Sequence, residues 1–329
     1  MDGARGAPRG DASRIAGCLA GGELMGRARL ERLAIVSDVH GNLPALRAVV
    51  EDVELVNPDR VIVNGDMVNR GPEGSAVLET IDALGWEMTL GNHDDLLRMW
   101  TERDPALPSS WFSDPFWRST GWCAHEVARA GWLPRIETLP RTVEIREAGA
   151  DTMIVSHGSP RHYREGYGKH LSDEAISEIV QMHPFDVLIG SHTHIPMQRT
   201  WGKHLVLNSG AVGSPFNRDP RAQYLVVTQK DGVWAPEFRR VAYDREAAFE
   251  AYEATGYLEQ AGLSAWLYRL ELATARSLLV PYMMWAETEG MMLDEAGWRA
   301  FVADRSLHLT APDEVGTRIV ARSEAIGVA

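Results

Sequence analysis

The sequence predicts an α/β fold in which two stacked β-sheets are flanked by helices. Three observations lead to this expectation. Between residues 33 and 90, short apolar runs alternate with amphipathic stretches in the order β-α-β-α-β. Each of these strands ends in a cluster of polar residues, which is where open α/β sheets place their functional sites. Along the whole chain about nine segments have strand character, which is enough for two sheets.

The first third of the chain contains the clearest elements. Asn42 is a suitable N-cap for a helix whose apolar residues form one stripe. Because side chains alternate along an extended segment, we expect Asp38 and His40 to point the same way just after the first strand. The expected elements are strands 33–36, 60–63 and 87–90 and helices 43–56 and 73–84.

An aromatic-rich insertion is expected between these elements and the later strands. Residues 100–132 read as mixed loops and helices, and they contain Trp100, Trp111, Trp117, Trp122, Trp132, Phe112 and Phe116. Two interpretations stay open. The aromatic side chains could wall the site and stack on a nucleobase, an interaction worth about 1–3 kcal/mol per base. The alternative, which we favour, is that they pack the insertion itself.

Strand character resumes after the insertion and gives way to helices near residue 245. Ser172 is expected to cap a helix over 172–182, and Asp231-Gly232 is typical of a hairpin turn. Residues 246–329 predict a helical extension, with a long helix over 265–287 that Pro281 kinks or divides. We expect this extension to pack on the core or on a second copy of the chain. The expected strands are 142–146, 152–155, 186–189, 204–207, 223–228 and 233–241.

Composition limits the class of protein. The chain has 329 residues, of which 45% are hydrophobic, and a net charge of −13, which argues against an extended nucleic-acid surface. No apolar run approaches the length of a membrane span, so no membrane partner is expected. The two cysteines, Cys18 and Cys123, suggest no disulfide framework, which favours a cytoplasmic location. Residues 1–28 are rich in Gly, Ala and Arg and are expected to be a disordered tail.

Seven potential metal ligands follow the predicted strands. They provide carboxylate, imidazole and amide atoms but no thiolate, a donor set that suits manganese, iron, zinc or cobalt better than a structural Cys-rich zinc site. A single histidine is more often structural than a ligand, whereas seven donors at strand-to-loop junctions form a pattern. The seven are Asp38, His40, Asp66, Asn92, His157, His192 and His194.

The order of these motifs resembles the calcineurin-like metallophosphoesterase superfamily. The series is Asp-x-His, Gly-Asp-x-x-x-Arg, Gly-Asn-His-Asp, His-Gly and His-x-His, and the resemblance covers residues 33 to about 245. It implies a four-layer α-β-β-α sandwich, with a metallophosphoesterase domain over 29–245, and a dinuclear metal centre. One metal would take Asp38, His40, Asp66 and His194, and the other Asp66, Asn92, His157 and His192, with Asp66 as the bridge. The stretches at 38–43, 157–161, 208–213 and 219–222 are similar to bacterial predicted phosphodiesterases.

Two departures from the family pattern stand out. Ser191 occupies a position before His-x-His where the family usually has glycine. Asn69 stands where protein serine/threonine phosphatases carry an aspartate that pairs with the histidine of Gly-Asn-His, which weakens a protein-phosphatase interpretation. Arg70 is retained at the position that contacts phosphate in those enzymes and in diadenosine tetraphosphate hydrolases.

The resemblance implies chemistry that requires no protein nucleophile. Two divalent transition metal ions (Mn, Fe, Zn, Co or Ni, with Mn favoured) about 3.5–4 Å apart would hold a bridging hydroxide and clamp the phosphoryl oxygens. The leaving alkoxide needs a proton, and His93, beside the ligand Asn92, is the predicted general acid. Asp94 is the candidate for orienting His93.

The sequence therefore predicts a metal-dependent phosphohydrolase, and more specifically a phosphodiesterase acting on a small phosphoester, for example a nucleotide. The alternatives are a phosphomonoesterase or a diadenosine-tetraphosphate-type hydrolase, which the run Arg70-Gly71-Pro72 supports. A scaffold that has lost its chemistry is a remote alternative, because all seven ligand positions are filled.

Overall fold

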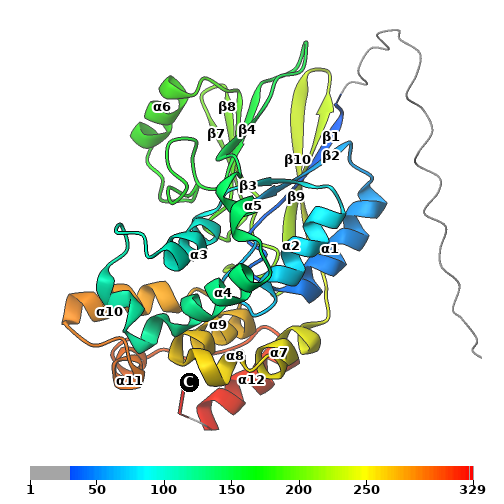
Figure 1. Cartoon of the computed structure of the whole chain (residues 1–329). Coiled ribbons are helices and arrows are strands. Elements are labelled where there is room, and N and C mark those ends of the chain that lie inside the picture. The colour runs from blue at the N-terminus through cyan, green and yellow to red at the C-terminus, as the bar shows by residue number, and fades with distance from the viewer. Residues whose placement is uncertain (1–29, 326, 329) are drawn as a thin grey trace, which may run out of the picture.

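A computed structural model describes residues 30–325, 327 and 328 of the chain. The predicted tail over 1–28 lies outside the described residues. Figure 1 shows two sheets packed face to face, helices over their outer surfaces and a group of C-terminal helices gathered at one end. This arrangement is the predicted α-β-β-α sandwich, with the inserted segment and the helical extension attached.

The first sheet contains the N-terminal strands and the last two strands of the chain. Its order is β10-β9-β1-β2-β3, where β1 (Arg32–Val36), β2 (Arg60–Asn64) and β3 (Glu87–Thr89) are parallel neighbours. Strand β9 (Ala222–Lys230) runs antiparallel to β1 and forms a hairpin with β10 (Val233–Val241). The turn residues Asp231 and Gly232 both have positive φ, as a two-residue hairpin requires.

The second sheet has the order β4-β5-β6-β8-β7. Strands β5 (Met153–Ser156), β6 (Val187–Gly190) and β8 (His204–Asn208) are parallel, and β4 (Thr142–Ile145) and β7 (Met197–Trp201) close the two edges antiparallel to their neighbours. Because neighbouring parallel strands end at the same edge of a sheet, the loops that follow them lie side by side there.

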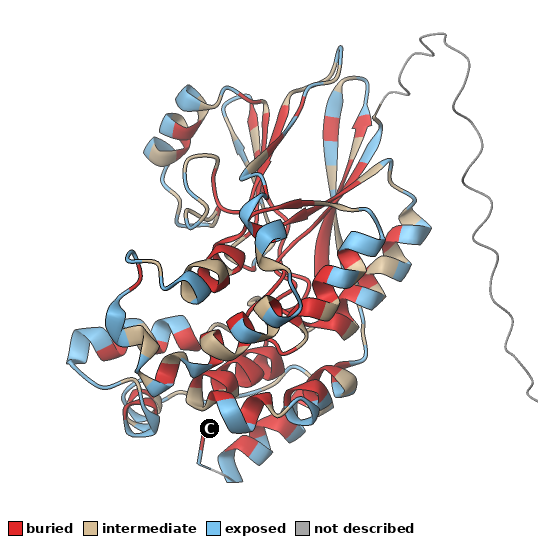
Figure 2. Cartoon of the chain, in the orientation of Figure 1, coloured by how far each residue is buried: buried red, intermediate tan, exposed pale blue. Residues whose placement is uncertain are grey.

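Three apolar clusters explain the layers. Alternate residues of β1 face opposite sides, so Leu33 and Ile35 belong to the core between the sheets, whereas Ala34 and Val36 face the helices. The core on the helical side of the first sheet includes α1 (Leu43–Val56) and α2 (Gly74–Ala83), and α6 (Asp173–Met182) covers the second sheet. Figure 2 shows buried residues concentrated on the strands and on the inward faces of the helices.

Local signals in the sequence set several element boundaries. The Asn42 side chain accepts a hydrogen bond from the Ala45 N–H (3.1 Å) at the start of α1, and Ser172 caps α6 through the Ala175 N–H (3.2 Å). Strand β7 was not predicted, so the described residues contain ten strands where about nine were expected. This strand has a single neighbour and an alternately exposed face, so it lacks the continuous apolar run that marks a central strand.

The inserted segment is helical and connects the core to the C-terminal helices. It contains the end of α3 (Asn92–Glu102), η1 (Ser109–Phe112), η2 (Pro115–Trp117) and α4 (Arg118–Arg129), and α5 (Leu133–Glu137) follows it. Helix α4 contacts α8 (Tyr257–Ala261) and α9 (Leu263–Thr274). The helix expected over 265–287 is divided, which is one of the two predicted outcomes, but the break lies between Thr274 and the start of α10 (Leu279–Glu289) rather than at Pro281. Pro281 lies in the first turn of α10, where its missing N–H costs nothing.

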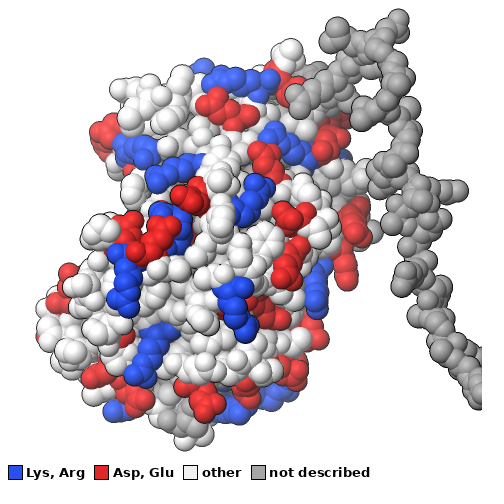
Figure 3. All heavy atoms as spheres, viewed as in Figure 1, with Lys and Arg blue, Asp and Glu red and all other residues white. Residues whose placement is uncertain are grey.

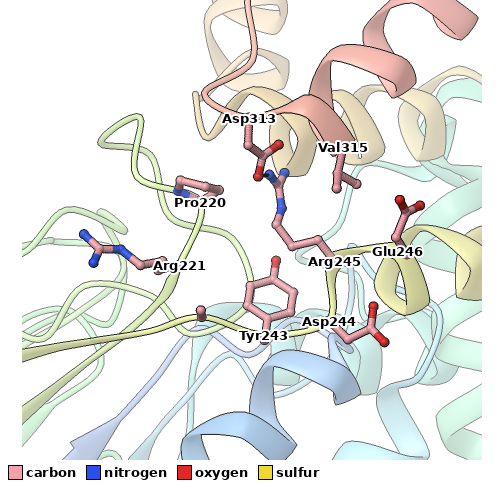
Figure 4. Close-up of a pocket in the computed structure, with 9 residues that line it drawn as sticks. Pro220, Arg221, Tyr243, Asp244, Arg245, Glu246, Asp313 and Val315 are labelled. Atoms are coloured by element: carbon pink, nitrogen blue, oxygen red, sulfur yellow. Dashed lines mark hydrogen bonds and ion pairs between the residues drawn. The ribbon is translucent and has the colours of Figure 1, made fainter.

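The C-terminal helices pack on the core rather than standing apart from it. Helix α7 (Arg245–Ala254) contacts α1, and α12 (Glu314–Ala325) lies along α9, while α11 (Glu295–Asp304) packs on α10. A pocket of about 360 Å³ opens between the segment that links β10 to α7 and the start of α12. Figure 4 shows Arg245 facing its ion-pair partner Asp313 there. None of the predicted metal ligands lines that pocket. Within the described residues, no helix is both long and apolar enough to cross a membrane.

Candidate metal centre

The seven predicted ligands lie at one edge of the sandwich, where loops from both sheets converge. Asp38 and His40 follow β1, Asp66 follows β2, and Asn92 is the first residue of α3 directly after β3. The second sheet contributes His157 after β5 and His192 and His194 after β6. Carboxyl ends of parallel strands therefore deliver every one of these side chains, as open α/β sheets usually do.

Five of the seven residues have a left-handed backbone, which corrects the expectation of an extended segment after β1. A non-glycine residue with positive φ typically costs about 1–3 kcal/mol and persists only where the surroundings enforce it. Here the backbone N–H groups of Asp38 and His40 donate to the carbonyls of Gly65 (3.1 Å) and Asp66 (3.0 Å), which fixes the two loops together. The five residues, with φ between 49° and 63°, are Asp38, His40, Asp66, His192 and His194.

One group of ligand atoms surrounds a point between the first sheet and His194. The ligand atoms of Asp38, His40, Asp66 and His194 all lie within 4.8 Å of one another, and all four residues are buried. His194 Nε2 lies 3.2 Å from Asp38 Oδ1 and also 3.2 Å from His40 Nε2. Atoms at such separations fit around a single cation.

The second group shares Asp66 with the first. Ligand atoms of Asp66, His157 and His192 lie within 4.8 Å of one another. His157 Nε2 is 3.2 Å from Asp66 Oδ2 and 3.2 Å from Asn92 Oδ1, which brings the predicted amide ligand into the same cluster. The Asp66 carboxylate therefore stands between two sets of donors.

The side chains fit a cation because the carboxylate oxygens that would bind it have no hydrogen-bond partner, while the histidine nitrogens on the far side of each ring are hydrogen-bonded to the backbone. Both Asp38 carboxylate oxygens and Asp66 Oδ2 are buried without any hydrogen-bond partner, which is costly for a charged group. The Nδ1 atoms of His40, His157 and His194 face the carbonyl oxygens of Val68 (3.3 Å), Asn64 (2.9 Å) and Ser214 (2.5 Å). A carbonyl oxygen can only accept a hydrogen bond, so Nδ1 carries a proton and Nε2 is the nitrogen available to a metal.

Burial and charge set the protonation of these ligands. Burial holds the pKa of His40 well below its usual range and lowers that of His192 to about 4, so both are neutral imidazoles. Burial alone would also lower the pKa of His157, but the Asp66 and Asp38 carboxylates raise it to about 10. The proton on His157 is thus held in a place where a cation would satisfy the same carboxylates.

Asp94 does not orient His93, contrary to the expected role. Its carboxylate accepts hydrogen bonds from the backbone N–H groups of Asp66 (2.8 Å), Met67 (2.9 Å) and Gly91 (2.9 Å), and also from Val68 (3.2 Å). Asp94 therefore holds the loop that carries Asp66 against the start of α3. Gly91 is required there, since a Cβ on it would lie 2.2 Å from the Asp66 backbone nitrogen.

The partner of His93 is Asn69. The Asn69 Nδ2 atom lies 2.9 Å from His93 Nδ1, and Asn69 Oδ1 accepts the Arg70 backbone N–H at 2.8 Å. This second bond determines which end of the amide faces His93, so Nδ1 must accept and the ring proton must sit on Nε2. Burial lowers the pKa of His93 to about 3, which also favours the neutral ring.

Arg70 is buried beside the cluster rather than displayed on the surface. Its Nη1 atom donates to Glu271 Oε2 at 2.8 Å, and its guanidinium lies over the rings of Phe216 and Tyr268. Phe216 stacks on the imidazole of His194 with 4.4 Å between ring centroids. No motif in the sequence pointed to Glu271, which lies 201 residues away from Arg70.

Ser191 is buried directly before the His192-Thr193-His194 segment. Its hydroxyl lies within 3.2 Å of His157 Nδ1 and donates to the carbonyl oxygens of His157 (3.0 Å) or Asn64 (3.2 Å). The Asn64 side chain donates in turn to Ser191 Oγ and to the Ser156 carbonyl. The hydroxyl therefore adds a tie between the loops of the two sheets that carry His157 and Asp66.

The aromatic side chains of the insertion pack on one another and on the helical core rather than on the predicted metal ligands. Trp111 and Trp117 stack on each other at 3.7 Å, and Trp100 contacts Phe112 at 4.8 Å between ring centroids. The helical core cluster receives Trp100, Trp117, Trp122 and Trp132 as partly buried members. These contacts agree with the packing interpretation.

Comparison with known proteins gives a consistent result. The family model described as calcineurin-like phosphoesterase matches residues 31–196, a range that contains all seven predicted ligands. A metallophosphoesterase from Sphaerobacter thermophilus is similar in structure, with a TM-score of 0.57, 25% identity and coverage of 74% of this chain and 99% of that one. A hypothetical protein from Pyrococcus horikoshii OT3 has a TM-score of 0.59 at 18% identity, covering 70% of this chain and 95% of that one, and shares the fold.

Sequence relatives point the same way. An uncharacterized protein of Methanocaldococcus jannaschii is 26% identical over 233 residues, which is 66% of this chain and 90% of the relative. A symmetrical bis(5'-nucleosyl)-tetraphosphatase of Pectobacterium carotovorum is 44% identical over 64 residues, but this stretch is only 18% of this chain and 22% of the relative.

Proposed function

The chain belongs to the calcineurin-like phosphoesterase family, and from that premise we propose that it is a metal-dependent phosphodiesterase acting on a small phosphoester, with a nucleotide ester as one candidate. As a family member it is a phosphoric ester hydrolase, and the family is metal-dependent. The observation that carries the finer proposal is the buried Asp66 carboxylate shared by two sets of ligand atoms: its Oδ1 accepts the His93 backbone N–H at 2.7 Å, and its Oδ2 has no hydrogen-bond partner.

We propose that the two sets hold two divalent transition metal ions. One site is Asp38, His40, Asp66 and His194, and the other is Asp66, Asn92, His157 and His192. Oxygen and nitrogen donors without thiolate suit Mn, Fe, Co, Ni or Zn, and manganese is the ion we favour. When bound, such ions polarise a phosphoryl group and lower the pKa of the attacking water.

The roles of the remaining side chains follow from their contacts. His93, held by Asn69 as the neutral Nε2–H form, would donate a hydrogen bond toward the leaving-group oxygen rather than act as an imidazolium acid. Arg70 would meet the phosphoryl oxygens through the guanidinium nitrogens that Glu271 does not engage. Asp94 would act on the chemistry only indirectly, by fixing the Asp66 loop.

One specific observation keeps a second function in view. Stretches of 62–64 residues are 38–44% identical to several symmetrical bis(5'-nucleosyl)-tetraphosphatases, although they span only 22–23% of those proteins. A hydrolase of dinucleoside polyphosphates is therefore the alternative, and a phosphomonoesterase is a further one.

We also propose a division of the chain and a location. Residues 29–245 would form the metallophosphoesterase domain and residues 246–329 a helical extension. A cytoplasmic location fits the free, buried Cys123. Acidic and basic side chains are interspersed over the face in Figure 3, which suits a small substrate better than a long nucleic acid.

A substrate panel on metal-reconstituted protein tests the function. Bis(p-nitrophenyl) phosphate, p-nitrophenyl phosphate, cyclic nucleotides and diadenosine tetraphosphate should be compared by kcat/KM after reconstitution with each candidate metal. We expect the highest kcat/KM for a diester with manganese. A preference for diadenosine tetraphosphate would favour the alternative function, and no metal-dependent hydrolysis of any of them would refute the proposal.

A further inference from the structure

Glu271 on the C-terminal helix α9 reaches the candidate metal centre from outside the family-matched residues 31–196. The residue is buried, with 1% of its side chain exposed. Its Oε2 accepts from Arg70 Nη1 at 2.8 Å, and its Oε1 accepts the backbone N–H groups of Leu278 (2.7 Å) and Leu279 (2.9 Å). The carboxylate is therefore fixed at both oxygens, and it joins the start of α10 to Arg70.

Arg70, in turn, lies against the candidate ligands. Its guanidinium carbon is 5.6 Å from the Phe216 ring, which stacks on the ligand His194. Its neighbour Asn69 holds His93. Arg70 Nε is buried without a hydrogen-bond partner, so the cation keeps a free donor at this position. A buried, charged donor without a partner indicates an anion as its missing ligand.

The pairing changes the charge that a bound anion meets. Arg70 without a partner would be a full cation, which favours a dianion over a monoanion. Arg70 paired with the Glu271 carboxylate is a neutral unit that can still donate hydrogen bonds. A phosphodiester carries one negative charge, and a phosphomonoester at pH 8 carries two, so the two classes of substrate respond differently to this pair.

We propose that Glu271 is a specificity-determining residue that holds Arg70 in place and cancels its charge, so that the site selects monoanionic phosphodiesters over dianionic phosphomonoesters. The inference rests on the proposed function and gives the C-terminal helices a part in choosing the substrate. At an effective dielectric constant near 20, one charge removed several ångströms from the phosphate should alter the preference by about tenfold.

The decisive variant is Glu271→Gln, measured with two substrates that share one leaving group. Glutamine keeps the shape and an acceptor oxygen for Leu278 and Leu279, but it removes the charge. Bis(p-nitrophenyl) phosphate and p-nitrophenyl phosphate should be compared at pH 8 with metal-loaded protein. We expect the diester-to-monoester ratio of kcat/KM to fall about tenfold in this variant.

Arg70→Gln should move the ratio the other way. This variant leaves the Glu271 carboxylate uncompensated, which repels a dianion more than a monoanion, so the ratio should rise while both rates fall. A purely structural role would lower both substrates alike in both variants. Glu253→Gln is the matched control, because it breaks the ion pair between Glu253 of α7 and Arg269 of α9, the helix that carries Glu271, and the ratio should stay unchanged.

Calorimetric titration with inorganic phosphate at pH 8 provides a readout that does not depend on turnover. Glu271→Gln should bind phosphate about tenfold more tightly than the unmodified protein, and Arg70→Gln more weakly. Thermal unfolding checks that each variant is folded. If Glu271→Gln does not fold, the direction of the change in phosphate affinity is taken from Arg70→Gln alone. Shifts of the same sign in both variants, or no shift, would overturn the inference. If the unmodified protein hydrolyses neither ester, the proposed function fails, and the phosphate titration still tests the charge pair.

Discussion

The strand-end loops and the C-terminal helices both reach the candidate metal centre, but in opposite ways. The loops deliver Asp38, His40 and Asp66 within a few residues of the strands that precede them, on strained, left-handed backbone. The helices contribute the carboxylate of Glu271, from the middle of an ordinary buried helix, and it pairs with Arg70, 201 positions away. The positions of the proposed metal ligands are therefore set by short segments next to the strands, whereas the charge of the neighbouring Arg70 depends on a contact between distant parts of the chain.

The comparison suggests two separable tasks. The loops provide the donors that would hold cations, and these donors are useful only if their protonation and spacing are right. The helices provide a partner for Arg70, which affects the anion and not the cation. Substitutions on each side should therefore change different quantities, and the following expectations rank them by size.

The largest effect is expected at the residue that both ligand sets share. Asp66→Ala should reduce hydrolysis to the buffer background, because both proposed sites lose a ligand at once. Metal analysis of purified protein should show the loss in parallel. Asp52→Asn is the matched control, since this carboxylate pairs with Arg239 and Tyr224 and touches none of the proposed ligands. Full activity of Asp66→Ala with one metal bound would break the two-site model.

His93 should matter most for poor leaving groups. If its Nε2–H donates to the leaving-group oxygen, His93→Ala should cost about 10²–10³-fold on alkyl phosphoesters, as for other single donors in active sites. Nitrophenyl esters need less help and should lose less. Rates plotted against leaving-group pKa for both proteins, at equal metal content, measure the difference. Parallel lines would place His93 outside the leaving-group site.

Asn69→Asp should convert His93 into a stronger acid. An aspartate would accept from His93 Nδ1–H and stabilise the imidazolium, so the pKa of His93 would rise from about 3. The protonated form is populated below that raised pKa, so the rate on alkyl esters should gain as the pH falls toward it. We expect about a tenfold gain, a fraction of the about 10²–10⁴-fold range of general acid catalysis. Identical pH–rate profiles of the two proteins would refute the assigned amide orientation.

Metal binding should depend on pH. Because Asp66 and Asp38 raise the pKa of His157 to about 10, the metal-free protein carries a proton there at neutral pH that a cation must displace. Affinity for manganese should therefore rise about tenfold per pH unit between pH 6 and 8, with one proton released. Calorimetry in buffers of different ionisation enthalpy counts that proton. A pH-independent affinity would mean that His157 is not a ligand.

The smallest effect is expected in the aromatic insertion. Trp111→Ala removes one ring of the Trp111–Trp117 stack, which should lower the free energy of unfolding by about 0.5–1.5 kcal/mol and leave kcat/KM on both nitrophenyl substrates unchanged. Denaturant unfolding and the two-substrate assay measure these quantities. A loss confined to nucleotide esters would revive the base-stacking interpretation.

The contrast between loops and helices also explains what sequence could predict. Strand and helix positions in the core followed from apolar periodicity, and the fold followed from the order of the motifs. The predicted ligand positions lie close together because they are attached to strand ends. Sequence could not reveal that Asp94 binds backbone N–H groups, that Asn69 fixes the His93 tautomer or that Glu271 meets Arg70. Each of these depends on the orientation of a side chain within the folded protein, and no periodic pattern encodes that orientation.

The separation of Arg70 from Glu271 along the chain has a consequence for synthesis. Every proposed metal ligand leaves the ribosome before the first residue of α9, so a growing chain contains the complete donor set while Arg70 still lacks its carboxylate. Cation binding can precede the final charge balance of the site. A chain broken off before residue 271 would contain every proposed metal ligand but would lack the carboxylate that pairs with Arg70.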